Sequence, residues 1–188
     1  WYAKTFATPK QPLAGGRVFV EFEGANSEAT VYVNGEKVTY HEGGYSTFRA
    51  DITGHLKEEN HMIVEVDNSK NDRVYPQKAD FTFYGGIYRD VKLLTVNRHH
   101  FDLDFQGGPG IAVTPKVAGN NASVRVRTWH NAPGAHVLIR LLDGEGYTVA
   151  EGMGEDITLT IQIRTTATDA ADGAAAGSNR TLAMELQR

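Results

Sequence analysis

The chain has 188 residues, 40% of them hydrophobic, and a formal net charge of −4. This composition suits one large or two small domains and excludes a disordered chain, and the lack of a basic segment argues against nucleic acid as a partner. Without cysteine the chain has neither disulfides nor thiol catalysis, and no apolar run is long enough to cross a bilayer, so we expect no membrane partner.

Residues 1–96 alternate between apolar and polar side chains with the period of two that half-buried strands require. The sequence predicts strands at 17–23, 30–33, 36–40 and 62–66. Asn34-Gly35 joins the second and third of these runs, and because this dipeptide tolerates positive φ angles it predicts a type I′ hairpin turn. The helical structure that we expect is one short turn within residues 52–59. Trp1-Tyr2 already falls inside a strand-like pattern, so we expect the natural N-terminus to lie upstream, and nothing assigns a compartment.

A domain boundary is expected near residues 95–98, where the pattern changes. Beyond it the predicted strands are 99–105, 111–117, 123–130, 136–142, 157–163 and 181–186. Turns rich in glycine and proline separate these strands at the spacing typical of an antiparallel sandwich. Residues 165–178 are rich in Ala, Asp, Thr and Gly and are interpreted as a mobile loop. We therefore predict an all-β chain with one domain at 1–96 and a second at 97–188.

The most informative stretch is residues 80–91, which read Asp-Phe-Thr-Phe-Tyr-Gly-Gly-Ile-Tyr-Arg-Asp-Val. It follows Phe-Glu-Gly at 22–24, a β-rich segment at 29–38, His-Glu-Gly-Gly-Tyr-Ser-Thr-Phe at 41–48 and Asp-Ile-Thr at 51–53. In this order and spacing the segments resemble the sugar-binding jelly-roll domain of glycoside hydrolase family 2, the β-galactosidase and β-glucuronidase family. The strand spacing after residue 98, with Gly-Gly-Pro-Gly-Ile-Ala-Val at 107–113, is similar to the immunoglobulin-like domain that follows in that family.

The resemblance implies a jelly-roll sandwich, truncated at its N-terminus, followed by an immunoglobulin-like β-sandwich. The family breaks glycosidic bonds in a barrel domain C-terminal to these modules, using two glutamates, one of which follows an asparagine. No Asn-Glu dipeptide occurs here, so we assign no catalytic residue and expect the chain alone to be inactive. The implied function is that of the non-catalytic N-terminal region of a family 2 enzyme, most similar to a β-galactosidase. Its implied partners are carbohydrate and the C-terminal barrel, and oligomerisation is left open.

Asp80 is the residue that the resemblance singles out. In the family, an aspartate six residues before the Gly-Ile-Tyr/Phe-Arg-Asp segment reaches into the active site of the barrel and contacts substrate hydroxyls. Asp80 stands six residues before Gly86. A carboxylate suits this task because it accepts hydrogen bonds from two vicinal hydroxyls. The alternative interpretation is an ordinary loop aspartate that caps a turn.

Other residues favour structural roles. Arg89 is interpreted as one partner of a buried or interdomain ion pair. Gly85-Gly86 is interpreted as a conformational element, since no Gly-Lys-Ser/Thr motif follows to make a phosphate loop. Most aromatic residues are assigned to the core, with Tyr75 or Phe81 as sugar contacts at a loop tip. The seven histidines form no ligand pattern, so neither a metal nor a cofactor is expected.

Three functions stay open at this point. The first is the N-terminal region of a family 2 glycosidase, the second a stand-alone carbohydrate-binding module, and the third a purely structural or oligomerisation module. An exposed aromatic platform with measurable sugar affinity favours the second. An open reading frame that continues to an Asn-Glu site establishes the first.

Overall fold

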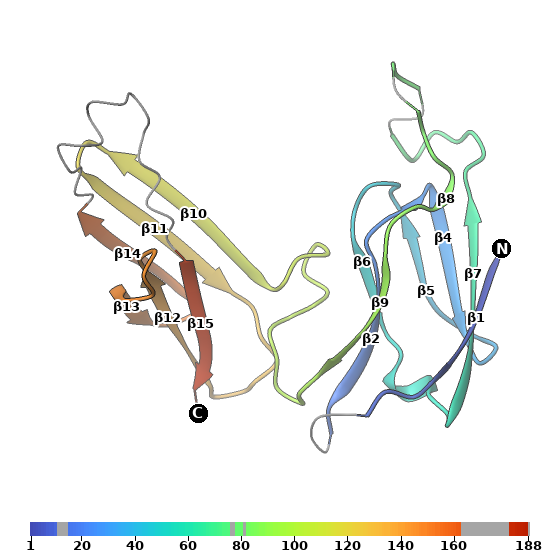
Figure 1. Ribbon diagram of the computed structural model, residues 1–188, viewed down its shortest axis with the longest axis horizontal. Coiled ribbons are helices and arrows are strands. Elements are labelled where there is room, and N and C mark those ends of the chain that lie inside the picture. The colour runs from blue at the N-terminus through green and yellow to red at the C-terminus, as the bar shows by residue number, and fades with distance from the viewer. Residues whose placement is uncertain (11–14, 76–77, 81, 163–180, 188) are drawn as a thin grey trace. The chain divides into compact units, whose positions relative to one another are not determined.

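The computed structural model describes residues 1–10, 15–75, 78–80, 82–162 and 181–187, the last segment as backbone (Figure 1). The described residues form an all-β protein, as predicted, and their one helical element is the 3₁₀ turn η1 at Thr53–His55 within the expected range. No helix in these segments is long and apolar enough to cross a membrane. The chain divides into two compact units, Trp1–Pro109 and Gly110–Arg188. The loop expected at 165–178 lies outside the described residues.

The first unit is a jelly-roll sandwich of two antiparallel sheets (Figure 1). The larger sheet has the order β1 (Tyr2–Ala7), β7 (Glu59–Asp67), β4 (Glu28–Val33), β5 (Glu36–Glu42). The smaller sheet has the order β6 (Phe48–Asp51), β2 (Arg17–Phe22), β9 (Val91–Val96). A short ladder joins β3 (Ala25–Asn26) to β8 (Gly86–Ile87).

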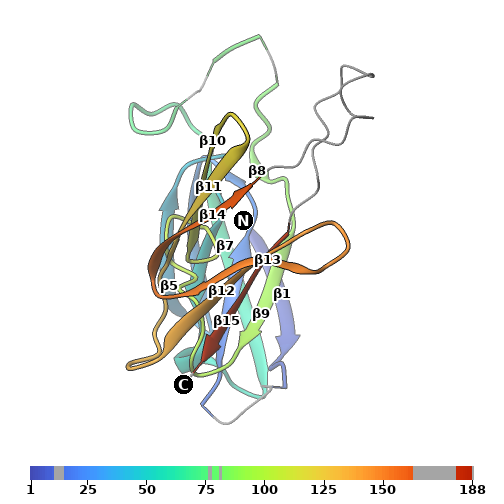
Figure 2. The same cartoon turned by 90° about the vertical axis from the view of Figure 1, so that its left-hand side faces the viewer.

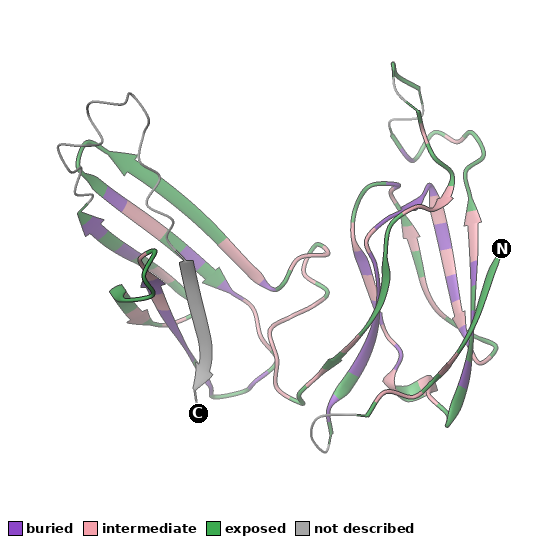
Figure 3. Cartoon of the chain, in the orientation of Figure 1, coloured by how far each residue is buried: buried purple, intermediate pink, exposed green. Residues whose placement is uncertain are grey.

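The hairpin between β4 and β5 is confirmed. Asn34 and Gly35 adopt φ angles of 53° and 89°, the positive values that the Asn-Gly turn predicts. The Asn34 side chain also ties the turn to the rest of the unit, because its Nδ2 donates to His55 O at 2.7 Å and its Oδ1 accepts from His61 N at 3.0 Å. Figure 3 shows β4 alternating between buried and half-buried residues, as a strand with one face on the core should.

The prediction that β2 is half-buried is wrong. Residues 18–22 are buried on both faces, including the outward-pointing Phe19 and Glu21 (Figure 3). The segment 97–109 covers the outer face of this strand, and His100 meets the ring of Phe19 edge-on at 5.8 Å. Glu21 is buried because it has a charged partner in Arg49 Nη2, 2.5 Å away.

The strand predicted at 99–105 is also wrong, because this segment is irregular. A side chain binds backbone carbonyls of this segment and of the glycines that follow it. Arg49 Nη1 lies 2.9 Å from Leu103 O, 3.0 Å from Gly107 O and 2.8 Å from Gly108 O. The last strand of the jelly roll ends at Val96, and residues 97–109 continue to pack on the first unit.

The second unit is an immunoglobulin-like β-sandwich of two three-stranded antiparallel sheets (Figures 1 and 2). One has the order β10 (Ile111–Ala118), β11 (Asn121–Thr128), β14 (Asp156–Gln162), and the other β13 (Thr148–Met153), β12 (His136–Leu142), β15 (Thr181–Gln187). Val126, Val137 and Ile139 are fully buried in it. The sequence missed β13, an edge strand whose residues are mostly exposed and include Gly152, so that it lacks an apolar alternation.

Candidate functional site

Asp80 lies in the long connection between β7 and β8, residues 68–85, at one end of the jelly-roll unit (Figure 1). Its side chain is exposed, as expected for a residue that reaches out of the sandwich. Phe81, proposed with Tyr75 as a sugar contact, lies outside the described residues. Tyr75 itself is 73% exposed, and Tyr84 at the other end of the connection is 68% exposed.

Residues 71–74 anchor this connection to the body of the unit. Asn71 Oδ1 accepts hydrogen bonds from the backbone N–H groups of Arg73 and Val74, both at 2.9 Å, and Val74 is buried. The Arg73 guanidinium pairs with Glu42 at 2.8 Å and also with Glu28. One cation, seven residues before Asp80, thus binds the loop to two neighbouring strands, β4 and β5.

Tyr40 completes the anchor from the sheet side. Its hydroxyl oxygen lies 2.7 Å from a carboxylate oxygen of Glu28 and 2.7 Å from one of Glu42. Hydrogen bonds to Glu42 and Glu28 raise the pKa of Tyr40 to about 12. The same hydroxyl, with Arg73, lowers the pKa of Glu42 below its ordinary value. Glu42 therefore serves as an ionised acceptor at neutral pH.

The glycine pair that ends the connection has a conformational role. Gly86 adopts a φ of +83°, and a Cβ there would stand 2.2 Å from the hydroxyl oxygen of Tyr2. A Cβ on Gly85 would stand 2.2 Å from Nδ2 of Asn68. A side chain at either position would displace Tyr2 or Asn68, so the glycines permit the close approach that closes this end of the sandwich.

The prediction that Arg89 forms a buried or interdomain ion pair is wrong for the described part of the chain. Arg89 is exposed, and its Nη1 donates to two backbone carbonyls, Glu23 O and Tyr45 O, each at 3.3 Å. The guanidinium carbon also lies 5.2 Å from the centre of the Tyr88 ring. Arg89 does hold loops together, but it does so through carbonyl oxygens, which a sequence pattern does not reveal.

A polar pocket of about 360 Å³ opens beside the same connection. Its lining combines amides, hydroxyls, ammonium groups and one ring: Asn26, Ser27, Asn68, Ser69, Lys70, Lys78 and Phe83. Asn26 is oriented by donating to Tyr84 O at 2.8 Å, and Ser27 by donating to Asp67 O at 3.0 Å. Such groups can bind sugar hydroxyls and, through the lysines, a carboxylate.

Sequence reasoning missed this pocket. Its two Asn-Ser pairs, 26–27 and 68–69, are distant in the chain and meet because β4 and β7 pair with Glu28 opposite Asp67. Predicting the pocket would have required the register of β4 against β7, and the sequence alone did not give that register. No cluster of three His, Cys, Asp or Glu side chains suited to a metal occurs in the ranges that the structure describes.

Residues 1–97 match the family model for glycosyl hydrolases family 2, sugar binding domain. The chain belongs to glycoside hydrolase family 2. It is 37% identical over 161 residues to a putative β-glucuronidase of Formosa agariphila, an alignment that covers 81% of this chain and 18% of that protein. It is 36% identical over 135 residues to a β-galactosidase of Thermoanaerobacter pseudethanolicus, covering 65% of this chain and 18% of that one.

Solved structures of the family extend the match to both units. The FMN-binding β-glucuronidase from Facaelibacterium prausnitzii L2-6 superposes on the whole of this chain with a TM-score of 0.85 and 40% identity, covering 30% of its own length. A Ruminococcus gnavus β-glucuronidase in complex with D-glucuronic acid covers 88% of this chain with a TM-score of 0.73 and 26% identity. The chain thus spans 18% to 30% of the length of these family 2 relatives.

Proposed function

We propose that this chain is the non-catalytic N-terminal region of a family 2 enzyme that hydrolyses terminal β-glycosides. In this proposal it supplies a scaffold and one substrate-contacting loop to a C-terminal catalytic barrel. The observation that carries the proposal is the exposed Asp80 carboxylate on a connection that Arg73 anchors to β4 and β5. An anchored loop presents its carboxylate without first having to be ordered by the substrate.

The role proposed for Asp80 is to accept hydrogen bonds from substrate hydroxyls. An ionised carboxylate has two oxygens and no donor, so it suits a pair of neighbouring hydroxyls. Contacts of this kind accelerate hydrolysis when they tighten as the sugar ring distorts toward the transition state. In this proposal Asp80 stabilises the transition state without taking part in bond breaking. The acid/base and the nucleophile come from the barrel.

The substrate class is a β-galactoside or a β-glucuronide. Relatives of both names match the chain with nearly equal identity, 37% and 36%. Comparing turnover of chromogenic β-galactosides and β-glucuronides by the full-length enzyme distinguishes the two.

The test is Asp80→Asn in the full-length enzyme, with Asp72→Asn as its matched control. Asp72 is also exposed and lies in the same connection. We expect Asp80→Asn to lower kcat/KM by on the order of 100-fold, since losing a hydrogen bond to a charged group costs about 1.5–3 kcal/mol and each 1.36 kcal/mol is tenfold in rate. Both substitutions should change the unfolding free energy by less than about 0.5 kcal/mol. Normal turnover of Asp80→Asn would refute the role proposed for Asp80.

A second candidate function is a stand-alone carbohydrate-binding module. It is favoured by the polar pocket at Asn26 and Asn68 and by the exposed rings of Tyr75 and Tyr84. Titration of the isolated chain with galactose and with glucuronate, followed by amide NMR, tests it. Saturable chemical-shift changes confined to this end of the jelly roll support the module. Unchanged spectra at a roughly 50-fold molar excess of sugar over protein, enough to detect binding with a Kd of about 1 mM, exclude it.

A further inference from the structure

Two lysines line the polar pocket beside the Asp80 connection. The pocket has a volume of about 360 Å³, which lies within the roughly 300 to 1,000 Å³ of small-molecule sites and suits a single sugar unit. Lys70 and Lys78 belong to its lining, whereas none of the described lining residues is an aspartate or a glutamate. In the part of the chain that the structure describes, no ion pair involves either lysine. Two cations without an acidic partner attract an anionic group into the cavity.

Neutral groups of the same pocket suit the hydroxyls and the ring of a sugar. Asn26 and Ser27 are buried, and each is already oriented by a hydrogen bond to a backbone carbonyl. Groups that are oriented in advance bind a ligand without first losing side-chain freedom. Phe83, half-buried and edge-on to Tyr45 with 6.5 Å between the ring centres, adds an apolar wall. A carboxylate, hydroxyls and an apolar ring face occur together in a uronic acid.

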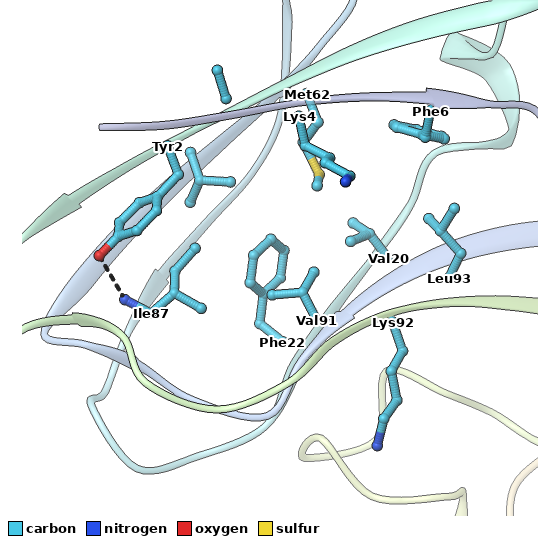
Figure 4. Close-up of a pocket in the computed structure, with 12 residues that line it drawn as sticks. Tyr2, Lys4, Phe6, Val20, Phe22, Met62, Ile87, Val91, Lys92 and Leu93 are labelled. Atoms are coloured by element: carbon cyan, nitrogen blue, oxygen red, sulfur yellow. Dashed lines mark hydrogen bonds between the residues drawn. The ribbon is translucent and has the colours of Figure 1, made fainter.

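Another cavity of the same unit has the opposite chemistry. It lies between β1 and β9, has a volume of about 400 Å³ and is lined mainly by aliphatic and aromatic side chains (Figure 4). Of its two lysines, Lys92 is already paired with Glu23. Sugar hydroxyls that entered this cavity would lose water and gain few hydrogen bonds in return, which costs free energy. The polar pocket therefore suits a carbohydrate better.

The polar pocket adjoins Asp80 without including it. Lys78 precedes Asp80 by two residues and Phe83 follows it by three, yet Asp80 is not one of the lining residues. Because consecutive Cα atoms are about 3.8 Å apart, the Cα atoms of Lys78 and Asp80 lie within about 7.6 Å of each other. Two linked sugar rings span this distance, so one oligosaccharide can reach both the pocket and Asp80.

We propose that the polar pocket is a subsite for a uronic acid unit, whose carboxylate is bound by Lys70 and Lys78, next to the sugar whose hydroxyls Asp80 contacts. The inference rests on the function proposed above and names its substrate more closely. That substrate is an acidic oligosaccharide in which the unit adjoining the cleaved one carries a carboxylate. Charge-assisted hydrogen bonds from the two ammonium groups select this unit over a neutral sugar of the same shape.

Ligand titration followed by amide NMR tests the pocket directly. The 188-residue chain is titrated with methyl β-D-glucuronoside and with its neutral amide, which share one ring and differ in charge. We expect saturable shifts at Asn68 and Lys70, and binding of the uronate on the order of 10-fold tighter than that of the amide. Lys70→Gln and Lys78→Gln should each remove most of this preference. Lys57→Gln is the matched control, because Lys57 is also exposed but lies at the other end of β7. Equal affinity for the two ligands, or no saturable shift with either, would overturn the proposal.

A sulfated sugar distinguishes the carboxylate from other anions, which two lysines also attract. The probe is methyl β-D-glucoside 6-sulfate, titrated in the same way. We expect it to bind more weakly than the uronate, because its charge extends further from the ring and the pocket suits a single sugar unit. Tighter binding of the sulfate than of the uronate would assign the pocket to sulfated sugars and overturn the proposed ligand.

Kinetics of the full-length enzyme separate this subsite from the role proposed for Asp80. Two disaccharide substrates are compared, which differ only in whether the unit next to the cleaved one is glucuronate or glucose. We expect the double variant Lys70→Gln/Lys78→Gln to raise KM for the acidic substrate by on the order of 10-fold with kcat unchanged, and to leave the neutral substrate unaffected, because the contact is equal in the ground and transition states.

Asp80→Asn should instead lower kcat/KM for both substrates. If Asp80→Asn has this effect but the lysine variant keeps its selectivity for the acidic substrate, the subsite is refuted and the proposed function stands. If the lysine variant loses that selectivity while Asp80→Asn turns over normally, the subsite stands and the role proposed for Asp80 is refuted.

Discussion

Tyr40 supports, from the sheet side, the ion pairs through which Arg73 links the Asp80 loop to the sheet. Its hydroxyl lies between Glu28 and Glu42, and both carboxylates also bind Arg73 from the loop. Ionising the hydroxyl would place a third negative charge beside these two, which is why its pKa lies above the ordinary value of 10.0.

We predict that Tyr40 titrates near pH 12 and not near pH 10. Folding raises this pKa, so the stabilisation is complete below pH 10 and is lost as the pH rises through about 12. The measurement is the tyrosine absorbance of the native chain against pH, with the curve of Tyr40→Phe subtracted. A Tyr40 step at the ordinary tyrosine value of 10.0 would show that the hydroxyl does not bind the carboxylates in solution.

At the scale of elements, the segment 97–109 is held by one side chain from β6. Arg49 forms a largely buried ion pair with Glu21 and donates to three carbonyls of the segment. The side chains of both ion-pair partners are 11% exposed. Such a pair is a weak source of stability when intact, but breaking it leaves an unpaired buried charge.

Arg49→Met should therefore destabilise the jelly-roll unit by about 3 kcal/mol or more, as other broken buried pairs do. The control is Arg17→Met, because Arg17 pairs with Asp51 at the surface, where its side chain is 52% exposed, and should cost no more than about 1 kcal/mol. Urea denaturation of both variants gives the comparison. Adding Glu21→Gln to Arg49→Met should restore part of the lost stability, because it removes the unpaired buried charge of Glu21. Equal costs for Arg49→Met and Arg17→Met would contradict the role of Arg49 in holding the segment 97–109.

At the scale of the whole molecule, the part of the chain that matches the family is a sugar binding domain. The match spans residues 1–97, and the sequence has no Asn-Glu dipeptide. Glycoside hydrolysis needs an acid and a second carboxylate on either side of the scissile bond.

We predict that the purified chain does not hydrolyse chromogenic β-galactosides or β-glucuronides. The assay is run beside Asp80→Asn made and purified in the same way, so that any trace of a host glycosidase appears equally in both. Turnover that persists after repurification and is unaffected by Asp80→Asn would reveal a second, unrecognised site in this chain.

The sequence by itself determined whatever depends on neighbours in the chain. Period-two alternation specified the all-β class, Asn34-Gly35 specified the first hairpin, and the β12 range at 136–142 was predicted with the bounds observed. The role of Asp80, which the family resemblance implies from its spacing to Gly86, stays a prediction. Local rules succeed here because side-chain period and turn angles are properties of short segments.

Only the tertiary structure decided which distant segments meet. It placed 97–109 over β2, so that residues 18–22 of this strand are buried on both faces although the sequence has glutamates at 21 and 23. It also left 99–105 irregular. It brought Arg73 to Glu28 and Glu42 and joined Asn26 with Asn68 in one pocket. These features depend on sheet register and on which strands lie at an edge. Both follow from the packing of residues far apart in the chain, which no local pattern encodes.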